Sequence, residues 1–107
     1  MESRDKKLQE IQILEQTLHN ISFQKQAFQL ELSETVESLN SLQSSGEEVF
    51  KIIGQLMIKT EKKKIREELV NKQKILELRI KSIEKEEDAL SKRVVSLREE
   101  MISTRKK

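Results

Sequence analysis

The residues that most often carry out enzyme chemistry are scarce or dispersed in this sequence. It has one histidine, His19, and no cysteine. Without a second histidine or a thiol, neither a catalytic triad nor a zinc site has its usual components. The 19 acidic residues are expected on exposed helix faces rather than in a cleft, and no glycine-rich phosphate loop occurs. The sequence therefore predicts a non-enzymatic protein without catalytic residues, metal or cofactor.

The composition favours long helices over a large globular core. Only 35% of the 107 residues are hydrophobic, 37% are charged, and there is no proline. Such a composition is typical of coiled coils. The longest apolar run is Leu56–Ile58 and the N-terminal segment is charged, so we expect neither a membrane span nor a signal peptide. The lack of cysteine fits a reducing compartment, and we expect a cytoplasmic protein.

Charges of both signs are interspersed along the chain. There are 21 basic and 19 acidic residues, giving a formal net charge of +2. This pattern is typical of solvated helix faces. A nucleic-acid-binding coiled coil is the third-ranked interpretation, because no clustered basic stripe supports it. We therefore expect no nucleic acid partner.

Apolar residues recur at alternating steps of three and four, first from Ile11 to Leu42 and again from Leu69 to Met101. This heptad spacing predicts two long helices that pack against each other. The first is expected at about residues 5–43, because two serines and Gly46 follow it. The second is expected at about 61–105, with Thr60 as a candidate N-cap.

The two predicted helices can bury their apolar stripes by folding back on each other. In an antiparallel register, positions that sum to 108 face each other, which pairs Ile11 with Leu97. The same register brings Thr35 level with Gln73 and Lys25 within one layer of Glu87. Polar residues in such a seam fix the register at some cost in stability. A register shifted by one heptad remains an alternative.

Between the helices, at about residues 48–60, β-branched and aromatic residues replace Leu, Glu and Lys. This segment predicts two short strands joined by a tight turn, with Gly54 at the position that requires a positive φ. Ile52 then faces Met57, and Phe50 faces Lys59. The alternative is a helix that continues through the glycine.

Such a hairpin would carry apolar side chains on both faces. An isolated two-stranded hairpin is marginal in water, and unpaired apolar strands need cover. We therefore expect strands from several subunits to assemble through these hairpins. The residues expected at that contact are Val49, Phe50, Ile52, Ile53, Leu56, Met57 and Ile58.

The order helix, VFKIIGQLMIKT, helix resembles the beta class of prefoldin subunits, the archaeal type most closely. The resemblance covers nearly the whole chain, residues 1–107, which would form a single prefoldin-like domain. It is most specific in Val49-Phe50-Lys51, Gly54, Leu56–Thr60 and Glu68-Leu69. Phe50 stands where such subunits often have tyrosine.

The resemblance implies a mainly α fold, a long antiparallel two-helix coiled coil whose β-hairpins form a barrel between subunits. Two alpha-class and four beta-class subunits would form a hexamer, and one hairpin between the helices fits the beta class. Non-native polypeptides would be held at the coiled-coil tips without ATP and passed to a group II chaperonin. The alternative is a coiled-coil scaffold or tether that holds no client.

Client contact at the tip would require apolar side chains outside the seam. Near the chain ends these are Leu8, Ile13 and Ile102, and the seam residue Met101 adds an adaptable side chain. These four are the preferred candidates. Three further residues of the seam could either contact the client as well or only close the coiled coil. They are Ile11, Leu14 and Leu97.

Overall fold

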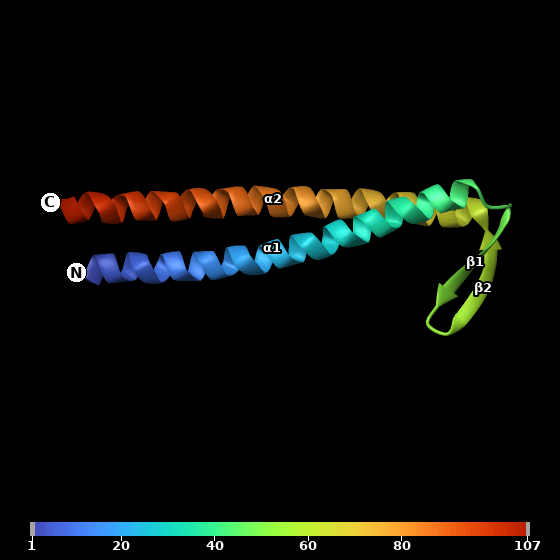
Figure 1. The fold of residues 1–107 in the computed structure, drawn as a ribbon, viewed down its shortest axis with the longest axis horizontal. Helices are drawn as coiled ribbons and strands as arrows, with labels where there is room; N and C mark the ends of the chain where they lie inside the picture. Colours follow the sequence, from blue (N-terminus) through green and yellow to red (C-terminus); the bar gives the residue numbers. More distant parts are fainter. Residues whose placement is uncertain (1, 107) are drawn as a thin grey trace. The chain divides into compact units, whose positions relative to one another are not determined.

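A computed structural model describes residues 2–106 of the chain. Helix α1 spans Glu2–Gln43, strand β1 Glu48–Ile53, strand β2 Leu56–Glu61 and helix α2 Lys62–Lys106 (Figure 1). This confirms the mainly α fold class, with two long helices and one β-hairpin. Neither of the two described helices contains an apolar stretch of the kind that a membrane span requires.

The chain divides into two compact units, and both helices contribute to each. The terminal unit contains the residues up to Ala27 and those from Ile80 onward. The hairpin unit contains Phe28–Arg79, and so includes both strands. Each unit is described by itself below.

The terminal unit closes around a small apolar cluster. Ile11, Val94 and Leu97 form its buried centre, and Leu97 is only 1% exposed. Leu14 and Leu18 pack against this centre. The predicted antiparallel register paired Ile11 with Leu97, and both residues lie in this cluster.

Ion pairs join the two helices across the rim of the terminal unit. Lys25 Nζ donates to Glu87 Oε1 at 2.7 Å, which confirms that these two residues lie in neighbouring layers. The hydrogen bond to Glu87 raises the pKa of the Lys25 ammonium above its usual value. Arg98 pairs with Glu15 in the same way.

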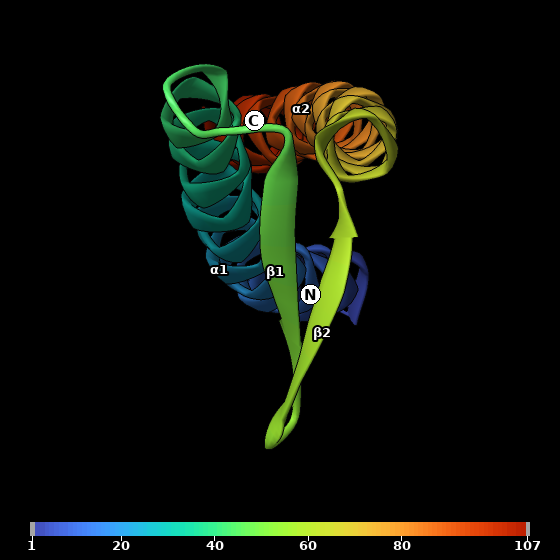
Figure 2. The same cartoon turned by 90° about the vertical axis from the view of Figure 1, so that its right-hand side faces the viewer.

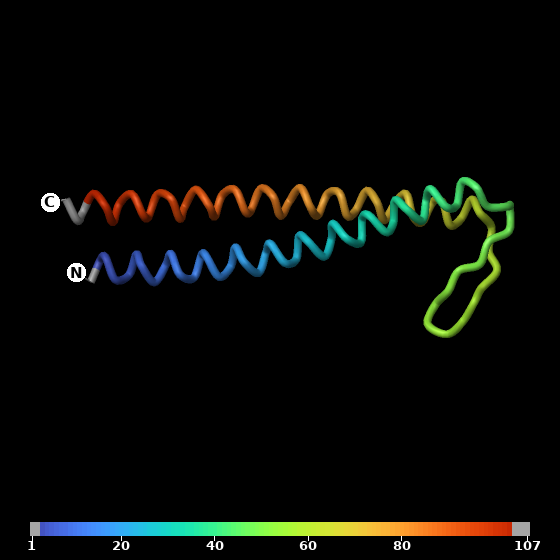
Figure 3. The backbone as a smooth tube through the Cα atoms, viewed as in Figure 1, coloured from blue at the N-terminus to red at the C-terminus, as the bar shows by residue number. Residues whose placement is uncertain are grey.

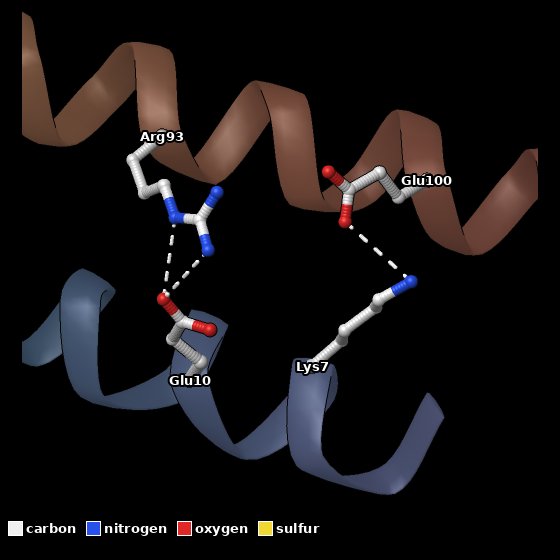
Figure 4. A network of polar contacts seen from close by, with 4 residues as sticks. All are labelled: Lys7, Glu10, Arg93 and Glu100. Carbon is white, nitrogen blue, oxygen red and sulfur yellow. Dashed lines mark hydrogen bonds and ion pairs between the residues drawn. The ribbon is translucent and has the colours of Figure 1, made fainter. Parts of the chain in front are cut away.

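A further group of cross-helix ion pairs lies nearer the chain ends (Figure 4). Arg93 Nε donates a hydrogen bond to Glu10 Oε1 at 3.2 Å, and Arg93 Nη2 lies 3.2 Å from the same oxygen. Lys7 Nζ lies 3.5 Å from Glu100 Oε2. Because these groups are partly exposed, each pair contributes about 0–1 kcal/mol, and their main effect is to favour this register of the helices over others.

In the hairpin unit, one polar seam residue satisfies its hydrogen bond locally. Thr35 is 3% exposed, and its hydroxyl donates to the backbone carbonyl of Glu31 at 2.8 Å. The Gln73 amide, expected at the same level, donates to Glu77 of its own helix at 3.1 Å. The two polar residues are therefore each satisfied within their own helix.

Strands β1 and β2 pair antiparallel in the predicted register. Ile52 faces Met57 and Phe50 faces Lys59, and the pairing extends to Glu48 opposite Glu61. Gly54 has a φ of 60°, which an L-residue with a Cβ adopts at a cost. The alternative of a continuous helix is therefore wrong. Figure 2 shows the two strands projecting from the helix ends as a two-stranded ribbon, and no other strand of the described chain pairs with it.

The chain turns between Gln43 and Glu48, where the backbone trace leaves one helix for the hairpin (Figure 3). Lys62 Nζ donates to the carbonyls of Gln43 and Ser45, at 3.3 and 2.9 Å. These carbonyls lie at the negative end of α1, where a cation is stabilising. The first residue of α2 therefore caps the C-terminus of α1.

The expected N-cap of the second helix is wrong. Thr60 lies in β2, where it pairs with Val49, and α2 begins two residues later at Lys62. The reason is that strand pairing continues past Thr60 to Glu61. Hydrogen bonding between the strands therefore takes priority over a cap at this position.

Candidate functional site

The β-hairpin is the most concentrated apolar surface among the described residues. Its large apolar side chains lie on both faces of the ribbon, because neighbouring residues of a strand point to opposite sides. Exposed fractions run from 44% for Ile58 to 69% for Ile52. The exposed side chains are Phe50, Ile52, Ile53, Leu56, Met57 and Ile58.

Two ion pairs brace this hairpin without covering it. Lys51 Nζ lies 2.7 Å from Glu68 Oε2 and so ties β1 to the first turns of α2. Lys59 and Glu48 pair across the strands at 3.1 Å. Val49, at the base of the hairpin, is the one expected contact residue that is half-buried. The other six expected assembly residues remain available for contact with another chain.

The second candidate surface is the tip, defined as the first turns of α1 and the last described turns of α2. Leu8, Ile13 and Ile102 are exposed there, Ile13 by 66%. Met101 is half-buried and packs against the terminal cluster. Three of the four preferred candidates are therefore in solvent, while the fourth connects the surface to the core.

The three candidates that belong to the seam are less accessible than the exposed residues of the tip. Ile11 and Leu97 are buried at the centre of the terminal cluster, and Leu14 packs against it. A client could contact Ile11 or Leu97 only if the helices separated locally. Their contribution to client binding stays a prediction.

Two arginines at the tip were not anticipated as site residues. A shallow pocket of about 210 Å³ is lined by Arg4, Arg98, Met101 and Ile102. It combines cationic and apolar groups from both helices. Arg4 falls on the heptad spacing continued back from Ile11 through Lys7. Because Arg4 and Lys7 are both charged, a search for apolar spacing gave no signal for Arg4.

The His19 side chain packs against an aromatic neighbour on its own helix. Its ring meets the Phe23 ring edge-on, with centroids 4.8 Å apart at 87°. Among the residues that the structure describes, no group of three or more His, Cys, Asp or Glu side chains could hold a metal ion. The two candidate surfaces are defined by exposed apolar side chains.

This chain is similar in sequence to a known protein family and to several of its known members. The chain matches the Prefoldin subunit family over residues 5–106. Prefoldin subunit beta of Thermococcus onnurineus is 35% identical over 85 residues, covering 78% of this chain and 73% of the relative. Prefoldin subunit beta of Thermococcus kodakarensis is 34% identical over 92 residues, covering 84% and 79%.

A solved structure agrees over nearly the whole chain. The crystal structure of the prefoldin beta subunit from Thermococcus strain KS-1 superposes with a TM-score of 0.88 at 31% identity. The superposition covers 95% of this chain and 91% of that one. The likeness therefore includes both helices and the hairpin between them.

Two long helices joined by an exposed β-hairpin define a helical-hairpin subunit with an unpaired strand edge. The family match and the relatives make the assignment specific. The chain belongs to the prefoldin family, in its beta class. This is a family of non-enzymatic subunits with a chaperone-type function.

Proposed function

We propose that this chain is one subunit of an ATP-independent chaperone that holds non-native polypeptides at its coiled-coil tips and passes them to a group II chaperonin. The observation that carries the proposal is the uncovered hairpin. Six large apolar side chains are exposed on a two-stranded ribbon, an arrangement that is marginal in water without further strands. Such a surface is suited to assembly with other subunits.

The hairpin unit supplies the assembly contact. Strands from further copies and from alpha-class subunits would pair with the free edges of β1 and β2 and close a β-barrel, which removes strand edges altogether. Two alpha-class and four beta-class chains make up the proposed hexamer. In it, the chain acts as a single prefoldin-like domain in the cytoplasm, without a nucleic acid or membrane partner.

The terminal unit supplies the client contact. Leu8, Ile13 and Ile102 present apolar surface to solvent, and Met101 adjoins them. Because hydrophobic attraction is non-directional, such a surface accepts many unfolded sequences. Ile11, Leu14 and Leu97 would join the contact only where the helix ends separate.

The proposal is tested by replacing Leu8, Ile13, Met101 and Ile102 with serine in the assembled protein. Each lost apolar contact weakens client binding by about 1 kcal/mol or more, so suppression of client aggregation should fall at least tenfold. Native mass spectrometry should find the mass of the assembly unchanged, because the hairpin is intact. Light scattering of a denatured model client measures the protection.

The matched control replaces four exposed apolar side chains away from the tip, and these are Phe23, Leu30, Ile75 and Leu78. Protection should survive in this control. Equal loss in both variants would mean that general hydrophobicity, and not the tip, holds the client. If the unaltered assembly gives no protection at all, the chain is a scaffold or tether instead.

A further inference from the structure

One flank of the hairpin unit carries acidic groups that have no ion-pair partner among the described residues. A groove of about 510 Å³ beside α1 is lined by Glu34, Glu37, Ser38 and Ser41, and it reaches Val49 at the base of β1. Neither Glu34 nor Glu37 makes an ion pair with any residue that the structure describes. These two carboxylates make the flank attractive to cations.

A surface on α2 has the opposite character. It is lined by Lys63, Arg66, Val70 and Asn71, with one acid, Glu67. Within the described chain, Lys63 and Arg66 have no carboxylate partner, whereas Lys62 beside them is engaged at the end of α1. Unpaired basic groups therefore face solvent here.

The two surfaces lie on opposite flanks of the helix pair. The seam of α1 runs through Thr35, Leu39 and Leu42. The acidic groove contains the positions just before these seam residues, whereas a separate groove contains the positions just after them, including Asn40 and Gln43. That second groove also includes Arg66 and Val70 of the basic surface. Since residues on either side of a seam point to opposite flanks, acid and base face away from each other.

Both flanks lie at the same level of the hairpin unit. Leu42 lines the acidic groove and also the groove that contains Arg66. Copies standing side by side, with their hairpins joined, would therefore present the acidic flank of one to the basic flank of the next. Two acidic flanks, or two basic ones, would repel each other.

We propose that neighbouring copies of this chain contact head to tail beside the hairpins, with Glu34 and Glu37 of one copy meeting Lys63 and Arg66 of the next. The contact is heterologous, so copies that it joins point in the same direction around the assembly. It rests on the proposed function, because the hairpins must first bring copies together. Opposite charges on the flanks then select the order and orientation of neighbours.

Cross-linking tests the proposal directly, because the chain has no cysteine of its own. Ser41→Cys and Asn71→Cys are introduced on separate copies, one of them isotopically labelled. Both sites are exposed, one beside each flank. The assembled protein is treated with a short bismaleimide, and mass spectrometry separates mixed products from same-position products. Mixed products should exceed same-position products at least fivefold.

Charge reversal sharpens the test. Glu34→Lys with Glu37→Lys should lower the mixed yield at least tenfold in low salt. Adding Lys63→Glu and Arg66→Glu on the same chain should restore the yield to within about threefold. Lys81→Glu with Lys85→Glu, on an exposed part of α2 in the terminal unit, is the control and should have no effect.

The outcomes separate this inference from the proposed function. If native mass spectrometry finds the assembly but the cross-links join only like positions, the head-to-tail contact is wrong. It is equally wrong if the fourfold reversal fails to restore the yield. A protein that stays monomeric would overturn the proposed assembly, and this contact with it.

Discussion

The terminal unit and the hairpin unit use apolar residues in opposite ways. In the terminal unit, the buried cluster of Ile11, Val94 and Leu97 forms between the two helices of one chain. The helical part of the hairpin unit also buries Leu42 and Leu76, but six large apolar side chains are exposed on its two short strands. A unit that buries its own stripe can be stable alone, whereas exposed strands of this kind need another chain. The difference separates the part that buries its apolar residues within the chain from the part that we propose assembles with other chains.

The charged residues follow the same division. In the terminal unit, ion pairs such as Lys25–Glu87 and Glu10–Arg93 join α1 to α2. In the hairpin unit, Glu31 pairs with Lys72, but the acidic and basic flanks hold charges without partners among the described residues. The exposed apolar side chains of the hairpin and the charged groups of these two flanks are therefore available to neighbouring chains, whereas Lys51 and Lys59 are engaged by Glu68 and Glu48.

The largest effect is expected from a charge placed in the hairpin. Ile52→Asp puts a carboxylate where the proposed barrel would bury it, and an unpaired buried charge costs about 3–5 kcal/mol. Assembly should weaken at least a hundredfold, as measured by native mass spectrometry across a dilution series. Leu78→Asp, at an equally exposed site on α2, should assemble normally. If both variants assembled equally well, or lost assembly equally, the hairpin would be no more important for assembly than the exposed surface of α2.

A smaller, purely local effect is expected in the terminal unit. Leu97→Ala deletes a buried side chain and leaves a cavity, which costs about 2–5 kcal/mol of unfolding free energy. Val95→Ala, on the exposed side of the same helix, should change it by less than about 0.5 kcal/mol. Urea unfolding followed by circular dichroism measures both. Loss of assembly in Leu97→Ala, with its helices intact, would show that the units do not have separate roles.

Most of the fold could be predicted because its signals are local. The heptad spacing indicated both helices, and Gly54 together with the β-branched residues around it fixed the turn and thus the pairing of Ile52 with Met57. The Lys25–Glu87 contact followed from register alone. Each of these features depends on sequence spacing and chain geometry.

The features that sequence did not reveal depend on contacts between distant segments. Lys62 begins α2, where a positive charge opposes the dipole of its own helix, yet it donates to carbonyls at the end of α1. Thr60 was expected to cap α2 but pairs with Val49 instead. The candidate tip was predicted only through its apolar residues, so Arg4 was missed. A contact such as that of Lys62, which a long side chain makes across the bend between two elements, produces no repeating pattern in the sequence.

The central claim is that the hairpin cannot be sheltered by its own chain. Native mass spectrometry of the unaltered protein, mixed with a cognate alpha-class subunit at micromolar concentration, tests it most directly. The account predicts a single hexameric mass of two alpha-class and four beta-class chains. A monomer that persists both with and without that partner would contradict it.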